Sequence, residues 1–329
     1  MSSSMSFSGR KVLITGGLGF IGSNLARRLV DLGADVIAVD SLVPEYGGNL
    51  YNLAGYEGRL RINVSDVRDR YSLQHLLRDR ELIFNLAGQT SHMDSMADPF
   101  TDLEINCTAQ LSLLETCRKV NPGIKIVFAS TRQIYGKPEY QPVDERHLLR
   151  PTDVNGVNKM AGEWYHILYN NVYGLRAVAL RLTNTYGPRM RVKDARQTFL
   201  GIWIKLLVEG KPFEVWGGEQ KRDFTYVDDA VEAMLRCALE PACDGQTLNV
   251  GGESVVTLRD LATMMVEAAG GGTFVTKEFP PDRKRIDIGD YYADDRRLRA
   301  LVGWSPQVGL AEGLKRSVDY YKSAIAHYL

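Results

Sequence analysis

The stretch that decides the fold is KVLITGGLGFIG, residues 11–22. Its first five residues form a short apolar run that predicts a buried strand, and an amphipathic segment, Gly22–Leu32, follows at once. Gly16, Gly19 and Gly22 stand between the two, spaced three apart. Glycines at this spacing allow a tight turn, close approach of the backbone to a phosphate and close packing of the helix on the strand. The free N–H groups at the helix N-terminus would then face that phosphate.

A carboxylate follows at the end of the next predicted strand. Asp40 closes the apolar run Val36–Asp40 and lies 18 residues beyond Gly22. A carboxylate in this place accepts hydrogen bonds from the adenosine ribose hydroxyls and repels a 2′-phosphate, so it favours NAD over NADP. Without a cofactor, the same glycines would form only a structural turn. We expect an NAD site that includes Gly16, Gly19, Phe20, Ile21, Gly22 and Asp40.

Strand and helix patterns alternate along the chain up to about residue 183. After the first two strands, short apolar runs predict strands at 59–64, 82–87, 124–130 and 177–182. Amphipathic segments predict helices at 72–80, 101–120 and 156–173. This alternation is typical of an α/β fold with a Rossmann-type doubly wound parallel sheet. The later chain is rich in Gly and Pro, which indicates a smaller, loop-rich region that ends in an amphipathic helix over 310–328.

Composition and charge narrow the class of protein. The 329 residues carry 40 Lys and Arg against 40 Asp and Glu, so there is no basic excess to bind nucleic acid. No apolar run approaches the roughly 18 residues of a membrane span. Four scattered cysteines indicate reduced thiols in a cytoplasmic protein, and no cluster has metal-ligand spacing. The serine-rich residues 1–9 lack the apolar segment of a signal peptide and are expected to be a disordered leader.

Several further segments fit one known family. They are SDV (65–67), NLAG (85–88), EINCT (104–108), ASTRQIYG (129–136), RLTNTYGP (181–188) and RDFTYVDD (222–229). Together with the glycine turn, they resemble the extended short-chain dehydrogenase/reductase family, and within it the NAD-dependent nucleotide-sugar epimerases and dehydratases. The resemblance covers the chain from Lys11 to about Trp304.

This resemblance implies residues for both ligands. For the cofactor, it adds Asp66 and Val67 at the adenine, Leu86 and Ala87 beneath the cofactor, and Lys159 at the nicotinamide ribose. For a nucleotide sugar, with a UDP-sugar favoured, it implies Asn184, Glu214, Trp216, Arg222 and Arg283.

The substrate residues have expected roles and competing interpretations. Arg222 and Arg283 would bind the pyrophosphate, with Arg285 as the alternative to Arg283. Glu214 and Trp216 would lie beside the base, where an aromatic ring can stack on it. The competing interpretations are a core aromatic for Trp216 and a solvated surface cluster for the two later arginines.

The fold of the family also implies a domain arrangement. We expect an NAD-binding domain over 10–183, to which about 223–240 returns, and a substrate-binding domain over 184–222 and 241–329. The smaller, C-terminal domain is therefore non-contiguous. Members of the family pair through two helices, so we expect a homodimer with a four-helix bundle that is formed by about 101–120 and 156–173.

One position departs from the family's catalytic pattern. The family removes a proton with the Tyr of a Tyr-x-x-x-Lys motif, whose two side chains share one helix face. Lys159 is present in this chain, but Asn155 occupies the Tyr position. An amide donates and accepts hydrogen bonds and does not act as a general base at neutral pH. Lys159 together with Thr131, the family's Ser/Thr, is the first candidate for the proton acceptor, and His92 is the second.

A second difference bears on the reaction class. Dehydratases of the family have an Asp-Glu pair after the active-site Thr, and in this chain those positions hold Arg132 and Gln133. Neither side chain can carry out acid–base elimination at neutral pH, so dehydration is disfavoured. We expect C4 epimerisation of an NDP-hexose through a transient 4-keto intermediate. The alternatives are an NDP-sugar dehydrogenase or ketoreductase, and a protein that binds NAD and a nucleotide sugar without turnover.

Overall fold

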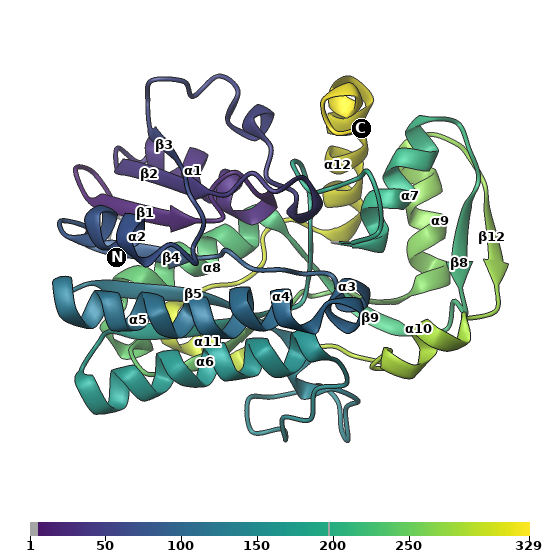
Figure 1. Cartoon of the computed structure of the whole chain (residues 1–329). Coiled ribbons are helices and arrows are strands. Elements are labelled where there is room, and N and C mark those ends of the chain that lie inside the picture. Colours follow the sequence, from purple (N-terminus) through teal and green to yellow (C-terminus); the bar gives the residue numbers. More distant parts are fainter. Residues whose placement is uncertain (1–5, 197) are drawn as a thin grey trace.

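A seven-stranded parallel sheet forms the centre of the computed structural model, which describes residues 6–196 and 198–329 (Figure 1). Its strand order is β10-β6-β5-β4-β1-β2-β3, and every neighbouring pair is parallel. The strands are β1 (Lys11–Thr15), β2 (Asp35–Asp40), β3 (Arg61–Val64), β4 (Leu82–Asn85), β5 (Lys125–Thr131), β6 (Ala177–Leu182) and β10 (Thr247–Val250). The doubly wound α/β fold that the alternating pattern predicts is confirmed.

Helices cover both faces of this sheet (Figure 1). α1 (Phe20–Asp31) and α8 (Val227–Leu239) pack against each other on one face. The other face is covered by α2 (Arg70–Leu77), α5 (Ala109–Val120) and α6 (Val154–Tyr173). Each helix presents an apolar stripe to the sheet and polar residues to the outside, as its sequence pattern predicts.

The first strand shows how the two layers divide the core. Val12 and Ile14 belong to the hydrophobic cluster that includes α1 and α8, whereas Leu13 belongs to the cluster of α2 and α5. Successive side chains of a strand point to opposite faces, and all three are fully buried. The interior of this central parallel strand is therefore apolar on both faces, which is the pattern that marks it in the sequence.

Two short helices precede α5. α3 (His92–Ala97) follows the loop after β4, and α4 (Pro99–Leu103) continues through a π-helical turn, Glu104–Thr108, into α5. The predicted helix over 101–120 is thus confirmed in its main part, but it begins two residues earlier and contains an irregular turn.

The smaller region contains two short sheets. One has the strand order β11-β9-β7 and the other pairs β12 with β8. These strands are β7 (Asn184–Tyr186), β8 (Phe213–Trp216), β9 (Lys221–Tyr226), β11 (Val255–Thr257) and β12 (Phe274–Lys277). The helices of this part are α7 (Phe199–Val208), α9 (Leu258–Ala269), α10 (Pro281–Ile286), α11 (Arg296–Val302) and α12 (Leu310–Ala324). Of these, α7, α9 and α12 pack against one another.

Three expectations need correction. β10 lies within the range assigned to the substrate-binding domain but is the edge strand of the central sheet, because its four residues pair with β6. Phe7 is fully buried in the core and the Gly9 N–H donates to Gly33 O at 2.8 Å, so residues 6–9 are not a disordered leader. Residues 1–5 lie outside the described residues. The C-terminal helix ends at Ala324, followed by a 3₁₀ turn over 325–327.

With β10 assigned to the NAD-binding domain, the division into two domains remains our proposal. α8 supports it, because this helix follows β9 of the smaller region and packs on β5 and β6. None of the helices in the described ranges is long and apolar enough to cross a membrane.

Candidate active site

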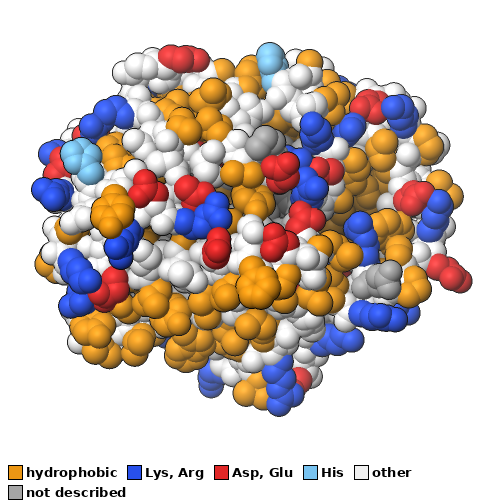
Figure 2. All heavy atoms as spheres, viewed as in Figure 1, with side chains coloured by type: hydrophobic (Ala, Val, Ile, Leu, Met, Phe, Trp, Pro, Cys, Tyr) orange, Lys and Arg blue, Asp and Glu red, His pale blue; other side chains and the backbone are white. Residues whose placement is uncertain are grey.

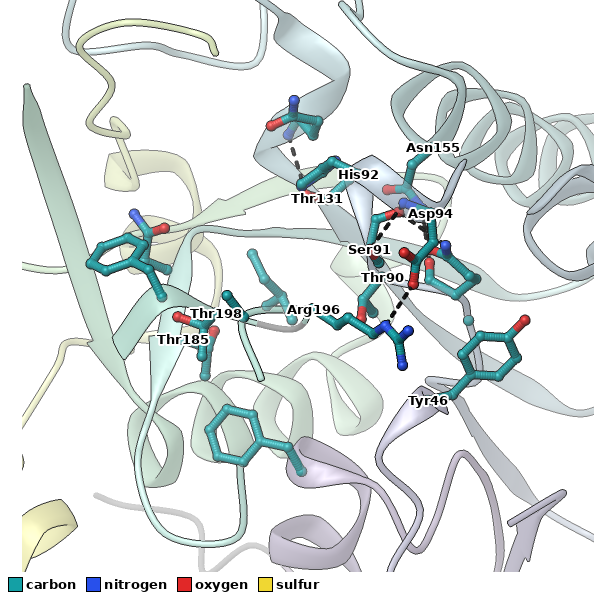
Figure 3. A pocket seen from close by; sticks show the side chains of 18 of the residues that line it. Tyr46, Thr90, Ser91, His92, Asp94, Thr131, Asn155, Thr185, Arg196 and Thr198 are labelled. Carbon is teal, nitrogen blue, oxygen red and sulfur yellow. Dashed lines mark hydrogen bonds and ion pairs between the residues drawn. The ribbon is translucent and has the colours of Figure 1, made fainter. Parts of the chain in front are cut away.

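A cavity of about 890 Å³ lies at the carboxyl ends of β1, β4, β5 and β6, and residues of the smaller region complete its wall (Figure 3). Every residue that the sequence assigns to a ligand or to catalysis lines this cavity, except Arg285, the alternative to Arg283. On the cofactor side these are Gly16, Gly19, Phe20, Ile21, Gly22, Asp40, Asp66, Val67, Leu86 and Ala87. The others are His92, Thr131, Asn155, Lys159, Asn184, Glu214, Trp216, Arg222 and Arg283.

The turn between β1 and α1 requires its glycines. A Cβ on Gly22 would lie 2.0 Å from Gly16 O, and a Cβ on Gly16 would lie 3.0 Å from Ala87 N. Gly16 also has a φ of +68°, which favours glycine. Gly19 caps α1 without a side-chain hydrogen bond, so the first N–H groups of this helix stay free for an anion. The cradle therefore fits the pyrophosphate of a dinucleotide.

Asp40 is held rigidly at the end of β2. Its Oδ2 accepts from Leu18 N at 3.0 Å and its Oδ1 accepts from Leu42 N at 2.9 Å. Burial raises the pKa of the Asp40 carboxyl, and these N–H groups act in the opposite direction. A carboxylate fixed in this way fits the adenosine ribose of the same cofactor.

Lys159 lies deep at the cofactor side of the cavity. Its ammonium donates to Ala129 O at 3.1 Å and lies 5.1 Å from the centre of the Phe128 ring. Burial lowers the pKa of Lys159 to about 8, although the negative charge of Asp102 acts in the opposite direction. A lysine with this pKa is partly neutral near physiological pH, so it can exchange a proton.

Asn155 directs its amide into the protein. Its Nδ2 donates to Gln89 O at 2.8 Å and to Asp102 Oδ2 at 2.9 Å. The other carboxylate oxygen of Asp102 accepts from Asn158 Nδ2 at 2.8 Å. Asp102 is fully buried, and the two amides provide it with hydrogen bonds that a buried carboxylate needs. The side chain at the family's Tyr position therefore satisfies the buried carboxyl group of Asp102.

His92 has a partner that the sequence did not reveal. Its Nδ1 lies 2.8 Å from Oδ2 of Asp153, the N-cap residue of α6. The same carboxylate accepts from Gly156 N at 2.7 Å and from Gln133 Nε2 at 3.0 Å. Burial acts to raise the pKa of Asp153, but the contacts with His92 and Gly156 outweigh it and the pKa is lowered. The ionised Asp153 therefore lies within ion-pair distance of His92, although the buried Nδ1 forms no hydrogen bond with it.

These contacts also reach Thr131. The Gln133 N–H donates to Thr131 Oγ1 at 3.2 Å, while the Gln133 side chain donates to Asp153. Thr131 at the end of β5 is therefore connected through Gln133 to the carboxylate that holds His92. The side chain of His92 is 39% exposed, and no described residue hydrogen-bonds its Nε2.

Trp216 and Arg283 lie together on the substrate side. The Arg283 guanidinium lies 4.6 Å from the centre of the Trp216 ring, a cation–π contact. Trp216 is only partly buried, so it is a wall residue of the cavity and not a core aromatic. Its Nε1 donates to Glu214 at 3.2 Å, and Lys277 pairs with the same carboxylate. Arg285 is exposed and is not among the lining residues.

Arg222 is a buried cation with protein acceptors. It donates to Lys221 O at 3.0 Å and to Asp287 Oδ1 at 3.1 Å, and it also contacts Gly289 O. Burial and the neighbouring Arg132 lower the pKa of Arg222 to about 10, so its charge persists at neutral pH. It is therefore a suitable partner for a phosphate group.

The two regions meet across the cavity through an ion pair. Arg196, in the loop before α7, lies 3.0 Å from Asp94 of α3 (Figure 3). Sequence reasoning missed this pair, and it also missed Asp102 and Asp153. Only Asp153 had a local signal, because an Asp directly before a predicted helix is a typical N-cap.

The chain is similar to known proteins over nearly its whole length. The model of the NAD dependent epimerase/dehydratase family matches residues 12–251. A putative UDP-glucose 4-epimerase of Methanocaldococcus jannaschii is 33% identical over 314 residues, which cover 95% of this chain and 98% of that protein.

Solved structures agree with this similarity. A UDP-glucose 4-epimerase of Thermotoga maritima with UDP-glucose superposes with a TM-score of 0.88 at 30% identity, covering 96% of this chain and 99% of that one. A UDP-glucose 4-epimerase of Thermus thermophilus with NAD gives a TM-score of 0.85 at 30% identity, covering 95% and 99% of the two chains.

Proposed function

The chain belongs to the NAD-dependent epimerase/dehydratase family, and from this premise we propose that it is a nucleotide-sugar 4-epimerase. Its cofactor is NAD. The proposal rests above all on one cavity, in which the glycine turn and Asp40 lie with Thr131, Lys159, Arg222 and the aromatic wall at Trp216. That set of residues suits a dinucleotide on one side and a nucleotide sugar on the other.

Each wall of the cavity would have its own task in the reaction. NAD supplies a reversible hydride acceptor. The helix N-terminus of α1 and Asp40 would hold the cofactor, while Arg222 and Arg283 would hold the pyrophosphate of the substrate. Thr131 would donate a hydrogen bond at the sugar hydroxyl that loses its proton. The 4-keto sugar would turn over in the cavity before the hydride returns to its other face.

The proton acceptor in this mechanism would be a side chain other than Asn155. Asn155 is excluded chemically, because an amide is not a base and its nitrogen is engaged with Gln89 and Asp102. Lys159 can take a proton in its neutral form. The contact with Asp153 supports His92 instead, because the carboxylate lies at ion-pair distance from Nδ1 while Nε2 hydrogen-bonds no described residue. We therefore place His92 before Lys159, which reverses the order that the sequence suggested.

Two side chains favour epimerisation over dehydration. Arg132 and Gln133 lie at the cavity wall directly after Thr131, and neither can protonate a leaving hydroxyl at neutral pH. Epimerisation needs no such acid, because the substrate keeps all its hydroxyl groups.

The experiment is an assay of a nucleotide-sugar panel with the NAD-loaded protein. UDP-, dTDP-, GDP- and CDP-sugars are followed by NMR of the anomeric protons and by absorbance at about 340 nm, where reduced nicotinamide absorbs. We expect one pair of C4 epimers to interconvert without net reduction of NAD. Stoichiometric absorbance change would identify an oxidoreductase, and ligand-induced thermal stabilisation without any change in the sugar would identify a binding protein.

A further inference from the structure

Arg132 is a cationic side chain of the cavity that the proposed reaction leaves without a task. It follows Thr131 at the end of β5 and lines the same cavity. Its Nη2 donates to Asn184 Oδ1 at 3.0 Å. Its Nη1 is buried and hydrogen-bonds no described residue. A buried guanidinium N–H without an acceptor is costly, so an acceptor on a ligand would relieve that cost.

The carboxylates near this cation act on it only through space. No carboxylate of the described residues forms an ion pair with Arg132. Asp287 pairs with Arg222 instead, at 3.1 Å. Asp223 contributes a favourable charge without contacting Arg132. Its Oδ2 accepts from Ala293 N at 3.2 Å and Gly252 N at 3.4 Å, and its buried Oδ1 hydrogen-bonds no described residue. Burial lowers the pKa of Arg132, as expected for a desolvated cation.

The guanidinium is nevertheless held in a fixed place. Asn184 accepts from Arg132 and donates with its own Nδ2 to Asp223 O at 2.9 Å, so both ends of this amide are engaged. The ring of Tyr291 lies beneath the guanidinium, 5.4 Å from its carbon to the ring centre. In the same cavity wall, Thr185 Oγ1 is buried and also lacks a described partner (Figure 3).

We propose that Arg132 binds a carboxylate on the sugar unit of the substrate, so that the enzyme prefers nucleotide sugars with an acidic sugar. A guanidinium matches a carboxylate through two parallel hydrogen bonds, which a neutral hydroxymethyl group cannot form. Arg222 and Arg283 are the expected pyrophosphate ligands, whereas Arg132 adjoins the residue expected at the reacting hydroxyl. The inference rests on the proposed function only in taking a nucleotide sugar as the ligand.

The test compares binding of matched probes to the NAD-loaded protein by calorimetry. UDP-glucuronate and UDP-glucose differ only at C6, and UDP-N-acetylmuramate carries its carboxylate on a side chain of the sugar. We expect at least one acidic probe to bind about 10- to 100-fold more tightly than UDP-glucose. Equal affinities, or tighter binding of UDP-glucose, would overturn the proposal. Because binding is measured without turnover, the result is independent of whether the protein is an epimerase.

Variants then assign the preference to this side chain. Arg132→Gln should remove the difference between acidic and neutral probes, whereas Arg132→Lys, which keeps the charge but not the fork, should retain part of it. Arg78→Gln, at an exposed arginine outside the cavity, should leave the preference intact. If Arg132 only balances the buried Asp223, the Gln variant will lose thermal stability and keep the preference, which contradicts the proposal. If Arg132→Gln does not fold, an unchanged preference for acidic probes in Arg132→Lys would also contradict the proposal.

Discussion

Asn155 occupies a catalytic position of the family, but in this site it makes structural hydrogen bonds. Its amide nitrogen bridges a backbone carbonyl and the buried carboxylate of Asp102, and its side chain is fully packed. A tyrosine in its place would remove one of the two amide groups that donate to Asp102 and would add a bulky aromatic ring. The residue at this position is therefore fitted to its surroundings, and proton transfer has to be carried out by another group.

His92 is the residue whose replacement should affect turnover most directly. We expect His92→Ala to lower kcat by about 10²- to 10⁴-fold, the usual contribution of a general base, and to leave NAD binding unchanged. His75→Ala, at an exposed histidine on α2, is the matched control and should keep full activity. The measurements are steady-state kinetics and NAD-induced thermal stabilisation.

The pH profile distinguishes His92 from Lys159. Lys159 accepts a proton only when it is neutral, so a reaction that depends on it should speed up as the pH rises through about 8. If His92→Ala keeps both the rate and such a rise, the acceptor is Lys159.

Asp153→Asn keeps an N-cap for α6 but removes the charge beside His92, so it should lower kcat more than it changes KM.

Asp40 determines the choice of cofactor in our interpretation. Replacing it by Ser removes the negative charge beside the adenosine ribose, so Asp40→Ser should narrow the preference for NAD over NADP by at least about tenfold. Dissociation constants of both cofactors, measured by fluorescence or calorimetry, test this. An unchanged ratio would mean that another group excludes the 2′-phosphate. Asp79→Ser, at a carboxylate outside the cavity that pairs with Lys11 at 2.9 Å, serves as the control and should leave the ratio unchanged.

At the scale of elements, the β1–α1 turn combines two functions. Its tight backbone joins a buried strand to a helix, and the absence of side chains leaves the N–H groups of α1 open to an anion. α6 combines functions in the same way, because Asp153 caps its first turn and contacts His92, while Lys159 lies one turn beyond Asn155. The functional residues therefore lie at the ends of elements that are rigidly packed.

Gly22→Ala should disrupt the first of these elements. The added methyl group would lie 2.0 Å from Gly16 O, a backbone atom that cannot move without displacing the turn. We expect a loss of about 1–3 kcal/mol in the free energy of unfolding, together with loss of NAD-induced stabilisation. Gly123→Ala, where the methyl group meets nothing within 4 Å, should be neutral in both measurements. Normal NAD binding by the Gly22 variant would contradict the role of this turn.

At the scale of the whole molecule, one face carries exposed apolar side chains. Trp164, Leu168 and Val172 on α6 are 57%, 48% and 60% exposed, and Phe100 on α4 is 75% exposed. Figure 2, which has the orientation of Figure 1, shows hydrophobic side chains gathered over the side of the molecule formed by α4, α5 and α6. Contiguous apolar surface of this kind is typical of a protein interface. We therefore propose that two copies pair through these helices, as the family resemblance implies.

Trp164→Glu tests this pairing. A charge in the middle of the apolar face should cost enough desolvation free energy to shift a dimer towards the monomer, which light scattering after size-exclusion chromatography measures directly. Tyr71→Glu replaces an exposed aromatic of α2, 70% exposed, and should leave the assembly unchanged. A wild-type protein that elutes as a monomer at all concentrations would refute the proposal.

Local sequence determined much of this protein by itself. The glycine turn, Asp40 and the buried apolar runs specify a doubly wound sheet with a dinucleotide cradle, because strand periodicity and glycine stereochemistry act over only a few residues. The lining residues at the ends of β1 and β2 were predictable for the same reason, since the carboxyl ends of parallel strands converge at one edge, whereas those on the substrate side came from the family resemblance.

Only the tertiary structure decided which side chains share a charge or a hydrogen bond. Asn155 meets Asp102 from 53 residues away, and Arg132 meets Asn184 from 52 residues away. β10 joins the central sheet through pairing with β6, which its four residues alone do not signal. Such contacts depend on where the packed layers bring distant segments together and on how burial raises the cost of an unpaired charge. The local pattern of the chain encodes neither the contacts between distant segments nor the cost of burying an unpaired charge.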